Sequence, residues 1–260
     1  MYNHEIDYRI IGEEMQCVEI QLDPQETAIG ESGSFMMMDQ DIQMETIFGD
    51  GSAETGGFLG KLMSAGKRLI VGESLFMTAF TNAGREKKTV TFAAPYPGKI
   101  IAMDLSRMNG KVICQKDAFL CAAKGVSVGI EFQRKLGTGL FGGEGFIMEK
   151  LEGDGMAFVH AGGHVMEKEL KHGEMIKIDT GCIVGFESTV QYDIQFIRGI
   201  KNMMFGGEGL FFATLQGPGK VWVQSLPISR LASKIISYGG FKRKEEGSIL
   251  GGLGNLLDGR

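Results

Sequence analysis

Apolar and polar residues alternate over short stretches along most of the chain, and residues that favour tight turns separate these stretches. The stretches 126–132 and 190–196 are examples, with an apolar residue at most alternate positions. An alternation with a period of two is typical of a β-strand that buries one of its faces. The pattern therefore predicts an all-β chain built from short antiparallel strands.

A glycine–glutamate turn stands before an apolar run at three places, 72–76, 143–147 and 207–211. After each run, a second tight turn leads into another apolar stretch. Self-similarity of this kind indicates one supersecondary unit that is repeated along the chain. The three copies set the expected fold before any catalytic motif is considered.

The three predicted units extend over about 6–104, 105–168 and 169–226. Each is too small to bury its own apolar face, so the units are expected to pack together. The predicted fold is three pseudo-repeated antiparallel β-sandwich units with approximate internal threefold symmetry.

The end of the chain has a different pattern, which predicts a short C-terminal helix over 227–238. Pro227 is suited to begin a helix. Four apolar residues then fall on one helical stripe: Ile228, Leu231, Ile235 and Ile236. Residues 1–238 are predicted to form a single all-β domain that includes this helix. Residues 239–260 are expected to form a Gly-rich tail that is mobile or contacts another subunit.

Composition narrows the partners and the compartment. The formal net charge is −5, which argues against DNA binding and makes RNA an unexpected partner, since such proteins normally present a basic face. No apolar run approaches the roughly 20 residues needed to span a bilayer, and the N-terminus lacks a signal-peptide pattern. Four cysteines have no paired spacing: Cys17, Cys114, Cys121 and Cys182. We expect a cytoplasmic protein, peripheral at the membrane if it binds one.

Two stretches resemble sites for a cofactor or a metal ion. Residues 137–142 spell G-x-G-x-x-G, but an apolar strand follows where the dinucleotide-binding fingerprint needs a helix. His160 and His164 flank a short turn, but no third ligand has a convincing spacing. We expect tight-turn glycines in the first case and surface histidines in the second. The sequence accordingly predicts no catalytic residue, no cofactor and no metal ion.

The loops that contain the repeated glutamates also carry cations and apolar residues. The candidate interaction face comprises twelve residues of these loops: Phe58, Lys61, Leu62, Lys67, Arg68, Glu73, Arg134, Lys135, Glu144, Arg198, Lys201 and Glu208. The glutamates either converge on one axis or pair locally with the cations and cap the hairpins. The apolar and cationic residues either bind an anionic membrane or a membrane protein, or complete a core or subunit interface.

Several segments together carry a family resemblance: 12–24, 31–36 and the two Gly-Gly-Glu-Gly turns at 142–145 and 206–209. They resemble a widespread family of bacterial and archaeal proteins that also includes the fungal altered-inheritance-of-mitochondria proteins. The resemblance extends over about 4–238. It implies a β-sandwich fold similar to that of the tryptophan RNA-binding attenuation protein, assembled into oligomers, and no established catalytic residues. Its mitochondrial members are linked to inner-membrane organisation.

The expected function is that of a non-catalytic, homo-oligomeric scaffold or binding module, which acts at a membrane surface if the cationic loops bind lipid. One alternative is a small-molecule or RNA-binding protein that uses clefts between the β units. A second alternative is a metal-dependent enzyme that uses the repeated carboxylates or the pair of His160 and His164.

Overall fold

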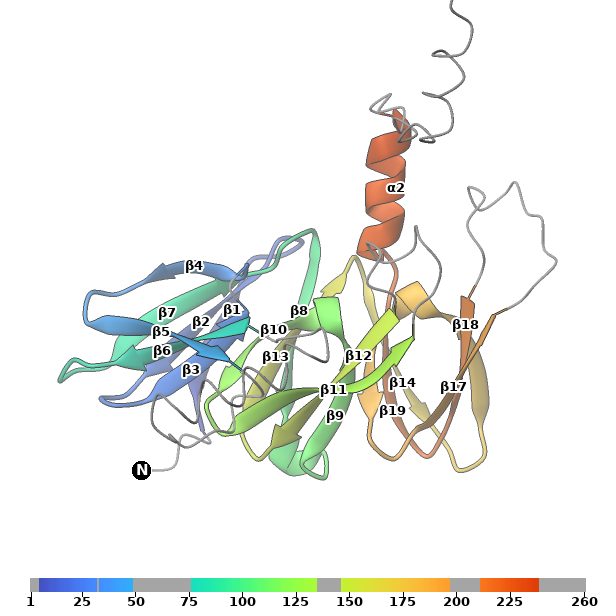
Figure 1. The fold of residues 1–260 in the computed structure, drawn as a ribbon, viewed down its shortest axis with the longest axis horizontal. Helices are drawn as coiled ribbons and strands as arrows, with labels where there is room; N and C mark the ends of the chain where they lie inside the picture. Colours follow the sequence, from blue (N-terminus) through green and yellow to red (C-terminus); the bar gives the residue numbers. More distant parts are fainter. Residues whose placement is uncertain (1–4, 32, 49–75, 135–145, 197–210, 239–260) are drawn as a thin grey trace, which may run out of the picture. The chain divides into compact units, whose positions relative to one another are not determined.

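The computed structural model of the chain describes residues 5–31, 33–48, 76–134, 146–196 and 211–238. The regular elements of these residues are strands, apart from three short 3-10 turns and one helix (Figure 1). The strands are β1 (Asp7–Ile11), β2 (Cys17–Leu22), β3 (Thr27–Glu31), β4 (Phe35–Met38), β5 (Ile42–Phe48), β6 (Phe76–Asn82), β7 (Lys88–Ala93), β8 (Gly98–Asp104), β9 (Lys111–Gln115), β10 (Phe119–Ala123), β11 (Val126–Arg134), β12 (Phe146–Gly153), β13 (Met156–Gly162), β14 (Val165–Leu170), β15 (Met175–Asp179), β16 (Ile183–Glu187), β17 (Gln191–Phe196), β18 (Phe211–Gln216) and β19 (Gly219–Gln224). The 3-10 turns are Leu105–Arg107, Lys116–Ala118 and Thr180–Cys182, and the helix is α2 (Ile228–Tyr238).

The described strands form four antiparallel sheets, named A to D here. Sheet A has the strand order β1-β2-β7-β4, and sheet B has the order β5-β6-β3-β10-β13-β8. Sheet C has the order β11-β12-β9-β16-β19-β14, and sheet D has the order β15-β18-β17. The prediction of an all-β chain with a short C-terminal helix is confirmed.

One set of six strands occurs three times in the same arrangement, as β2–β7, β8–β13 and β14–β19. In every set, the first, sixth and third strands are neighbours in one sheet, and the second, fifth and fourth strands are neighbours in the next sheet. Each set is therefore divided between two sheets. The units predicted from the sequence have β8 at the end of the first unit and β14 at the end of the second. In the structure, β8 pairs with β13 and β14 pairs with β19, so each is the first strand of the following set.

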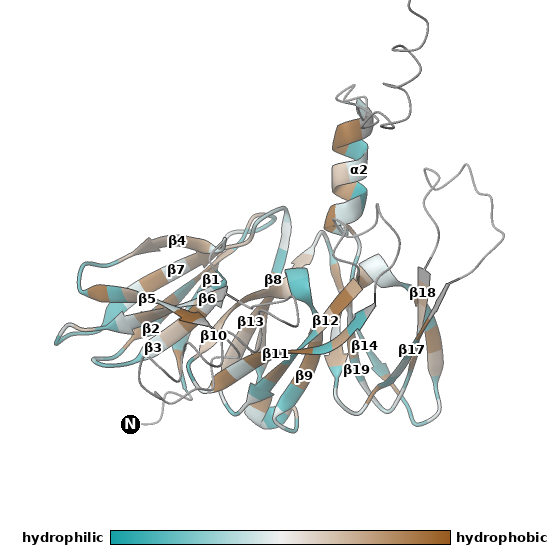
Figure 2. Ribbon diagram, viewed as in Figure 1, coloured by the Kyte–Doolittle hydropathy of each residue, from teal (hydrophilic) through white to brown (hydrophobic). Residues whose placement is uncertain are grey.

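Three apolar cores lie between the sheets. One is shared by sheets A and B, with Ile20 and Phe158 among its residues. A second is shared by sheets B and C, with Val159 and Trp222, and a third by sheets C and D, with Phe186. Figure 2 shows the brown, apolar positions along these strands. Sheets B and C are consequently apolar on both faces, which explains the continuous apolar runs of β10 and β13.

Contacts divide the chain into two compact units, residues 1–228 and 229–260. The four sheets belong to the first unit. Nearly all of α2 belongs to the second, and its bounds agree with the helix predicted from the apolar stripe.

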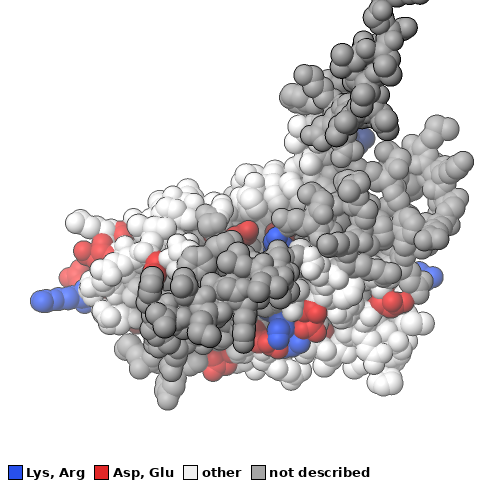
Figure 3. All heavy atoms as spheres, in the orientation of Figure 1, with Lys and Arg blue, Asp and Glu red and all other residues white. Residues whose placement is uncertain are grey.

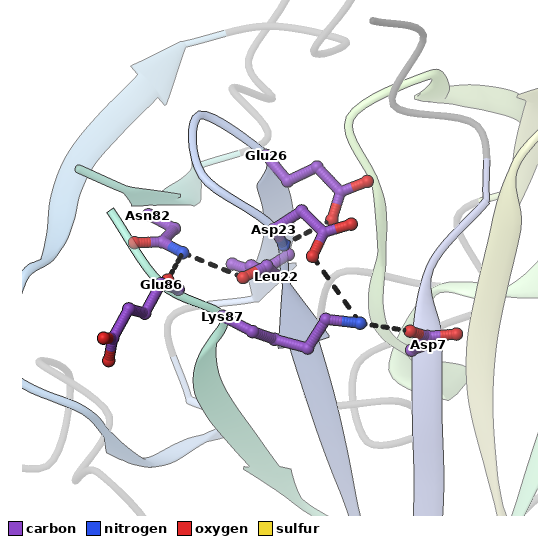
Figure 4. A network of polar contacts seen from close by, with 7 residues as sticks. All are labelled: Asp7, Leu22, Asp23, Glu26, Asn82, Glu86 and Lys87. Carbon is purple, nitrogen blue, oxygen red and sulfur yellow. Dashed lines mark hydrogen bonds and ion pairs between the residues drawn. The ribbon is translucent and has the colours of Figure 1, made fainter. Parts of the chain in front are cut away.

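A buried asparagine holds the turn between β6 and β7 (Figure 4). The Asn82 side chain is fully buried, and its amide nitrogen donates to the carbonyl oxygens of Leu22 and Glu86, at 2.8 Å each. Its Oδ1 accepts a hydrogen bond from the backbone N–H of Gly84 at 2.9 Å. One side chain therefore satisfies three backbone groups at the corner where the chain passes from sheet B to sheet A.

The Asn82→Ala variant is expected to lose about 2 to 3 kcal/mol of unfolding free energy, because buried backbone groups lose their partner. Urea unfolding followed by circular dichroism measures this loss. Gln43, which is exposed on β5, provides the control. The Gln43→Ala variant should stay within about 0.5 kcal/mol of the unchanged protein. Equal effects of the two substitutions would show that the Asn82 hydrogen bonds do not stabilise the turn.

Candidate functional site: the ends of three equivalent hairpins

The three stretches that carry the candidate interaction face connect equivalent strands. Each one joins the fourth strand of a set to the fifth, so that it lies between β5 and β6, between β11 and β12, or between β17 and β18. The last described pairs of these hairpins are Phe48 with Phe76, Arg134 with Phe146, and Phe196 with Phe211. The repeated glycine–glutamate turns thus belong to the same hairpin of each set, as their spacing predicted.

Most residues of the candidate interaction face lie outside the described residues. Arg134 is the exception, because it is the last residue of β11. The remaining eleven are Phe58, Lys61, Leu62, Lys67, Arg68, Glu73, Lys135, Glu144, Arg198, Lys201 and Glu208. The convergence of the three glutamates, and the binding of a membrane or partner by these loops, therefore stay predictions.

The described base of the second hairpin is buried. Phe146 and Met148 are about 1% exposed and contribute to the core between sheets C and D. Glu149 is also buried, and its strand partner across the sheet is Cys114. Burial, reinforced by the charge of Glu149, raises the pKa of the Cys114 thiol well above its ordinary value. Because the thiolate is the nucleophilic form, Cys114 is unreactive at neutral pH.

The glycine motif at 137–142 lies outside the described residues, but its neighbours are described. It connects β11 to β12, which pair as an antiparallel hairpin. A dinucleotide-binding loop instead connects a strand to a helix, whose N-terminus faces the pyrophosphate. The surrounding strands therefore favour the interpretation of these glycines as turn residues.

His160 lies in the core, and the prediction of a surface histidine at this position is wrong. The side chain is 1% exposed, and its ring makes an edge-on contact with Tyr96 at a centroid distance of 4.4 Å. Burial lowers the pKa of His160 to about 4, so the imidazole is neutral at physiological pH. Burial also raises the pKa of Tyr96 to about 12. The apolar run Met156–Gly162 around the histidine was the available indication of its burial.

The matching positions in the other sets carry different residues. Phe92, Val159 and Val223 occupy equivalent places in the sixth strands, because each pairs with the first residue of a third strand. The next residues are Ala93, His160 and Gln224. The buried Gln224 side chain accepts from the backbone N–H of Gly162 at 2.7 Å and donates to the carbonyl of Gly181 at 2.9 Å. The first bond connects sheet B to sheet C, and the second connects sheet C to the 3-10 turn Thr180–Cys182.

The pair of histidines does not assemble a metal site with its neighbours. His164 is exposed in the turn between β13 and β14, whereas His160 is buried. Glu167 accepts hydrogen bonds from Lys220 Nζ at 2.7 Å and Trp222 Nε1 at 3.0 Å, which give this carboxylate a structural role. No group of three His, Cys, Asp or Glu residues suited to a metal ion occurs within the described part of the chain.

Charged residues of both signs lie side by side on the described surface in Figure 3. Ion pairs among the described residues include Lys111 with Glu131 at 2.9 Å and Lys220 with Glu167 at 2.7 Å. The described part of this face is therefore mixed in charge rather than basic. Among the described residues, no helix has the length and apolar character that crossing a bilayer requires.

The divided strand set, repeated three times, defines a β-sandwich protein built from internal repeats. Residues 8–226 match the family described as mitochondrial biogenesis AIM24, and the chain belongs to that family. The resemblance recognised from its sequence segments is thereby confirmed.

Streptococcal proteins provide the comparisons. An uncharacterised protein of Streptococcus pyogenes serotype M6 is 30% identical over 225 residues, which cover 85% of this chain and 86% of that protein. The crystal structure of protein SPYM3_0169 from Streptococcus pyogenes matches with a TM-score of 0.67 at 23% identity, over 90% of this chain and 99% of that chain. The structural match shows a shared fold.

The burial of His160 predicts a specific dependence of stability on pH. Its pKa is about 4 in the folded protein and about 6.5 when unfolded, so the unfolded chain binds the proton more tightly. Above pH 6.5 the neutral His160 does not lower the free energy of unfolding. As the pH drops towards 4, protonation of His160 in the unfolded chain lowers this free energy by up to about 3 kcal/mol. The His160→Phe variant should lack this component, as measured by urea unfolding between pH 7.5 and 4.5.

The exposed His164 provides a matched control for this measurement. The His164→Phe variant makes the same chemical change and should keep the pH dependence of the unchanged protein. If the His160→Phe variant also kept it, the folded protein would tolerate a charged imidazole in this core.

Proposed function

We propose that this protein is a non-catalytic, homo-oligomeric scaffold or binding module that works at an anionic membrane surface. The observation that carries the membrane part is the composition of α2 and the segment around it. The three strand sets supply the scaffold, and the C-terminal segment supplies the attraction to lipid.

The residues of α2 are sorted onto two sides. Positions three or four apart share one side of a helix. The apolar side contains Ile228, Leu231, Ala232, Ile235, Ile236 and Tyr238, and the polar side contains Ser229, Arg230, Ser233, Lys234 and Ser237. Ile235 is 59% exposed and Ile236 is 54% exposed. Figure 2 shows apolar and polar residues along this helix. A helix of this design suits the boundary between lipid headgroups and acyl chains.

The charge of the segment complements an anionic surface. Between positions 225 and 244 there are five basic residues and no acidic residue; the basic residues are Arg230, Lys234, Lys242, Arg243 and Lys244. The whole chain, in contrast, has a net charge of −5. Each cation near an anionic bilayer contributes about 1 kcal/mol of attraction. Apolar burial and charge therefore act together in one short segment.

The three hairpin loops are a second source of membrane affinity in this proposal. Their apolar and cationic residues, such as Phe58, Lys61, Leu62 and Lys67, would add contacts from the scaffold. They are separate from α2 in sequence, so variants of the two regions test different parts of the proposal. Reversible, composition-dependent attachment is expected, since a helix at the lipid interface binds through apolar burial and attraction to anionic lipids.

Cosedimentation of the full chain with vesicles tests the role of α2. The protein should bind vesicles of phosphatidylserine and phosphatidylcholine more tightly than vesicles of phosphatidylcholine alone, and the difference should shrink at high salt. The Ile235→Asp variant should bind the anionic vesicles at least about ten times more weakly than the Ser233→Asp variant, because only the former loses apolar burial.

Ser233→Asp is the matched control, since both substitutions add one negative charge to the helix. A decrease in vesicle binding that both variants share measures the electrostatic contribution. The difference in binding between the two variants measures the contribution of the apolar side of α2. Absence of binding by the unchanged protein would refute the membrane part of the proposal. Equal binding by the two variants would remove α2 from it.

A further inference from the structure

The three strand sets are joined by two internal junctions of the same design. In each junction the second strand of one set pairs with the third strand of the next, β3 with β10 and β9 with β16. Gly30 is opposite Cys121 in the first junction, and Cys114 is opposite Gly185 in the second. These pairings complete the six strands of sheets B and C. The junction is thus the contact that converts separate sets into one structure.

A shared β-bulge identifies equivalent positions in the third strands. The register against the sixth strand shifts at one place in each: Phe35/Met37 in β4, Phe119/Cys121 in β10 and Ile183/Gly185 in β16. Met37 therefore corresponds to Cys121 and Gly185. β4 therefore has the same β-bulge as β10 and β16, the third strands that form the two internal junctions.

The fifth strands identify equivalent positions in the second strands. Gly30, Cys114 and Ile178 each pair with a residue that stands five positions after the glutamate of a glycine–glutamate turn; these partners are Thr78, Glu149 and Ala213. Ile178 of β15 therefore corresponds to Gly30 and Cys114. β15 is the second strand of the last set, and no fourth set follows it within the described residues.

The terminal third strand is exposed where its internal counterparts are buried. All five residues of β10 and four of the five residues of β16 are buried. All four residues of β4 are exposed, and they are large and apolar: Phe35 at 36%, Met36 at 53%, Met37 at 52% and Met38 at 38%. An exposed apolar edge strand is a template for pairing with another chain.

The two open edges are complementary halves of one junction. Among the described strands, β4 pairs only with β7, and β15 pairs only with β18. The half-sheet β17-β18-β15 ends at a second strand, and the half-sheet β4-β7-β2 begins with a third strand. Joined at β15 and β4, they reproduce the strand order of sheets B and C. The occupant that fits each edge is therefore a second copy of this chain.

We propose that β15 of one copy pairs antiparallel with β4 of another copy, with Ile178 opposite Met37 and Lys177 opposite Met38. This inference rests on the proposed oligomeric scaffold and identifies its subunit contact. The two surfaces differ, so copies assemble head to tail into a ring or a filament. Lys177 of β15 corresponds to Ile29 and Ile113, which are buried. Its charge discourages other pairings of this edge, and in the assembly its aliphatic stem would pack along β4.

Cysteine cross-linking of co-expressed variants tests the register. Cys17 and Cys182 are first replaced by serine, because they are partly exposed and could form other disulfides. Cys114 and Cys121 are buried and are kept. The Met37→Cys and Ile178→Cys variants should each stay uncross-linked alone and should form a disulfide-linked dimer when co-expressed and oxidised. Met44, which is 49% exposed on β5, provides the control. The Met44→Cys variant should not cross-link with Ile178→Cys.

Light scattering coupled to size-exclusion chromatography gives an independent readout. The unchanged protein should have a mass that is a multiple of 28.3 kDa. The Met37→Glu variant should have the mass of one chain, because a carboxylate would be buried in the junction. Met15→Glu, at an exposed methionine between β1 and β2, should leave the oligomer unchanged.

Each outcome separates this inference from the proposed function. A monomeric unchanged protein overturns both the inference and the oligomeric scaffold. An oligomer in which Met37→Cys and Ile178→Cys do not cross-link overturns the inference alone. Cross-linking of Met37→Cys with itself shows symmetric pairing of β4 with β4, and also overturns the inference.

Discussion

Each strand set divides its six strands between two sheets, and the rest of the structure depends on this division. Adjacent residues of one strand therefore serve different cores: Ala28 packs in the core between sheets A and B, and Ile29 in the core between sheets B and C. A set on its own would leave half of each core uncovered. Stability thus comes from pairing between sets, in the manner of repeat proteins whose units fold only beside a neighbour.

This division also explains which parts of the fold the sequence could predict. Strand periodicity and the glycine–glutamate turns are local, and they were sufficient to predict the all-β class, the three copies and the equivalent hairpins. The membership of β8 and β14 depends on pairing with β13 and β19, which are far along the chain. The prediction from sequence position therefore grouped β8 and β14 with the strands before them, whereas they pair with strands of the following set.

The candidate site was predictable to a similar extent. The spacing of the turns correctly predicted that the three stretches connect equivalent strands of the three sets, because that relation follows from strand order. The sequence predicted His160 at the surface because it is a polar residue beside a turn. The apolar residues around it in the same strand place it in the core. Glu73, Glu144 and Glu208 lie outside the described residues, so their convergence stays a prediction.

Charge is distributed unequally between the two parts of the chain. Residues 225–260 contain six basic and three acidic residues, so residues 1–224 carry a net charge of −8 within the total of −5. In the proposed attachment, an anionic bilayer would attract the C-terminal segment and the cationic stretches between the hairpin strands, and would repel the acidic remainder of the sets. The same field that attaches such a protein would therefore also orient it.

The sixth-strand position occupied by Ala93, His160 and Gln224 has a consequence for how the three sets can evolve. In an oligomer assembled from separate single sets, one gene would specify one residue for every copy of that position. Fusion into one chain removes this identity, so one copy can become a neutral buried imidazole while another becomes a hydrogen-bonded amide. A ligand that recognised either residue would bind once per chain, and not three times.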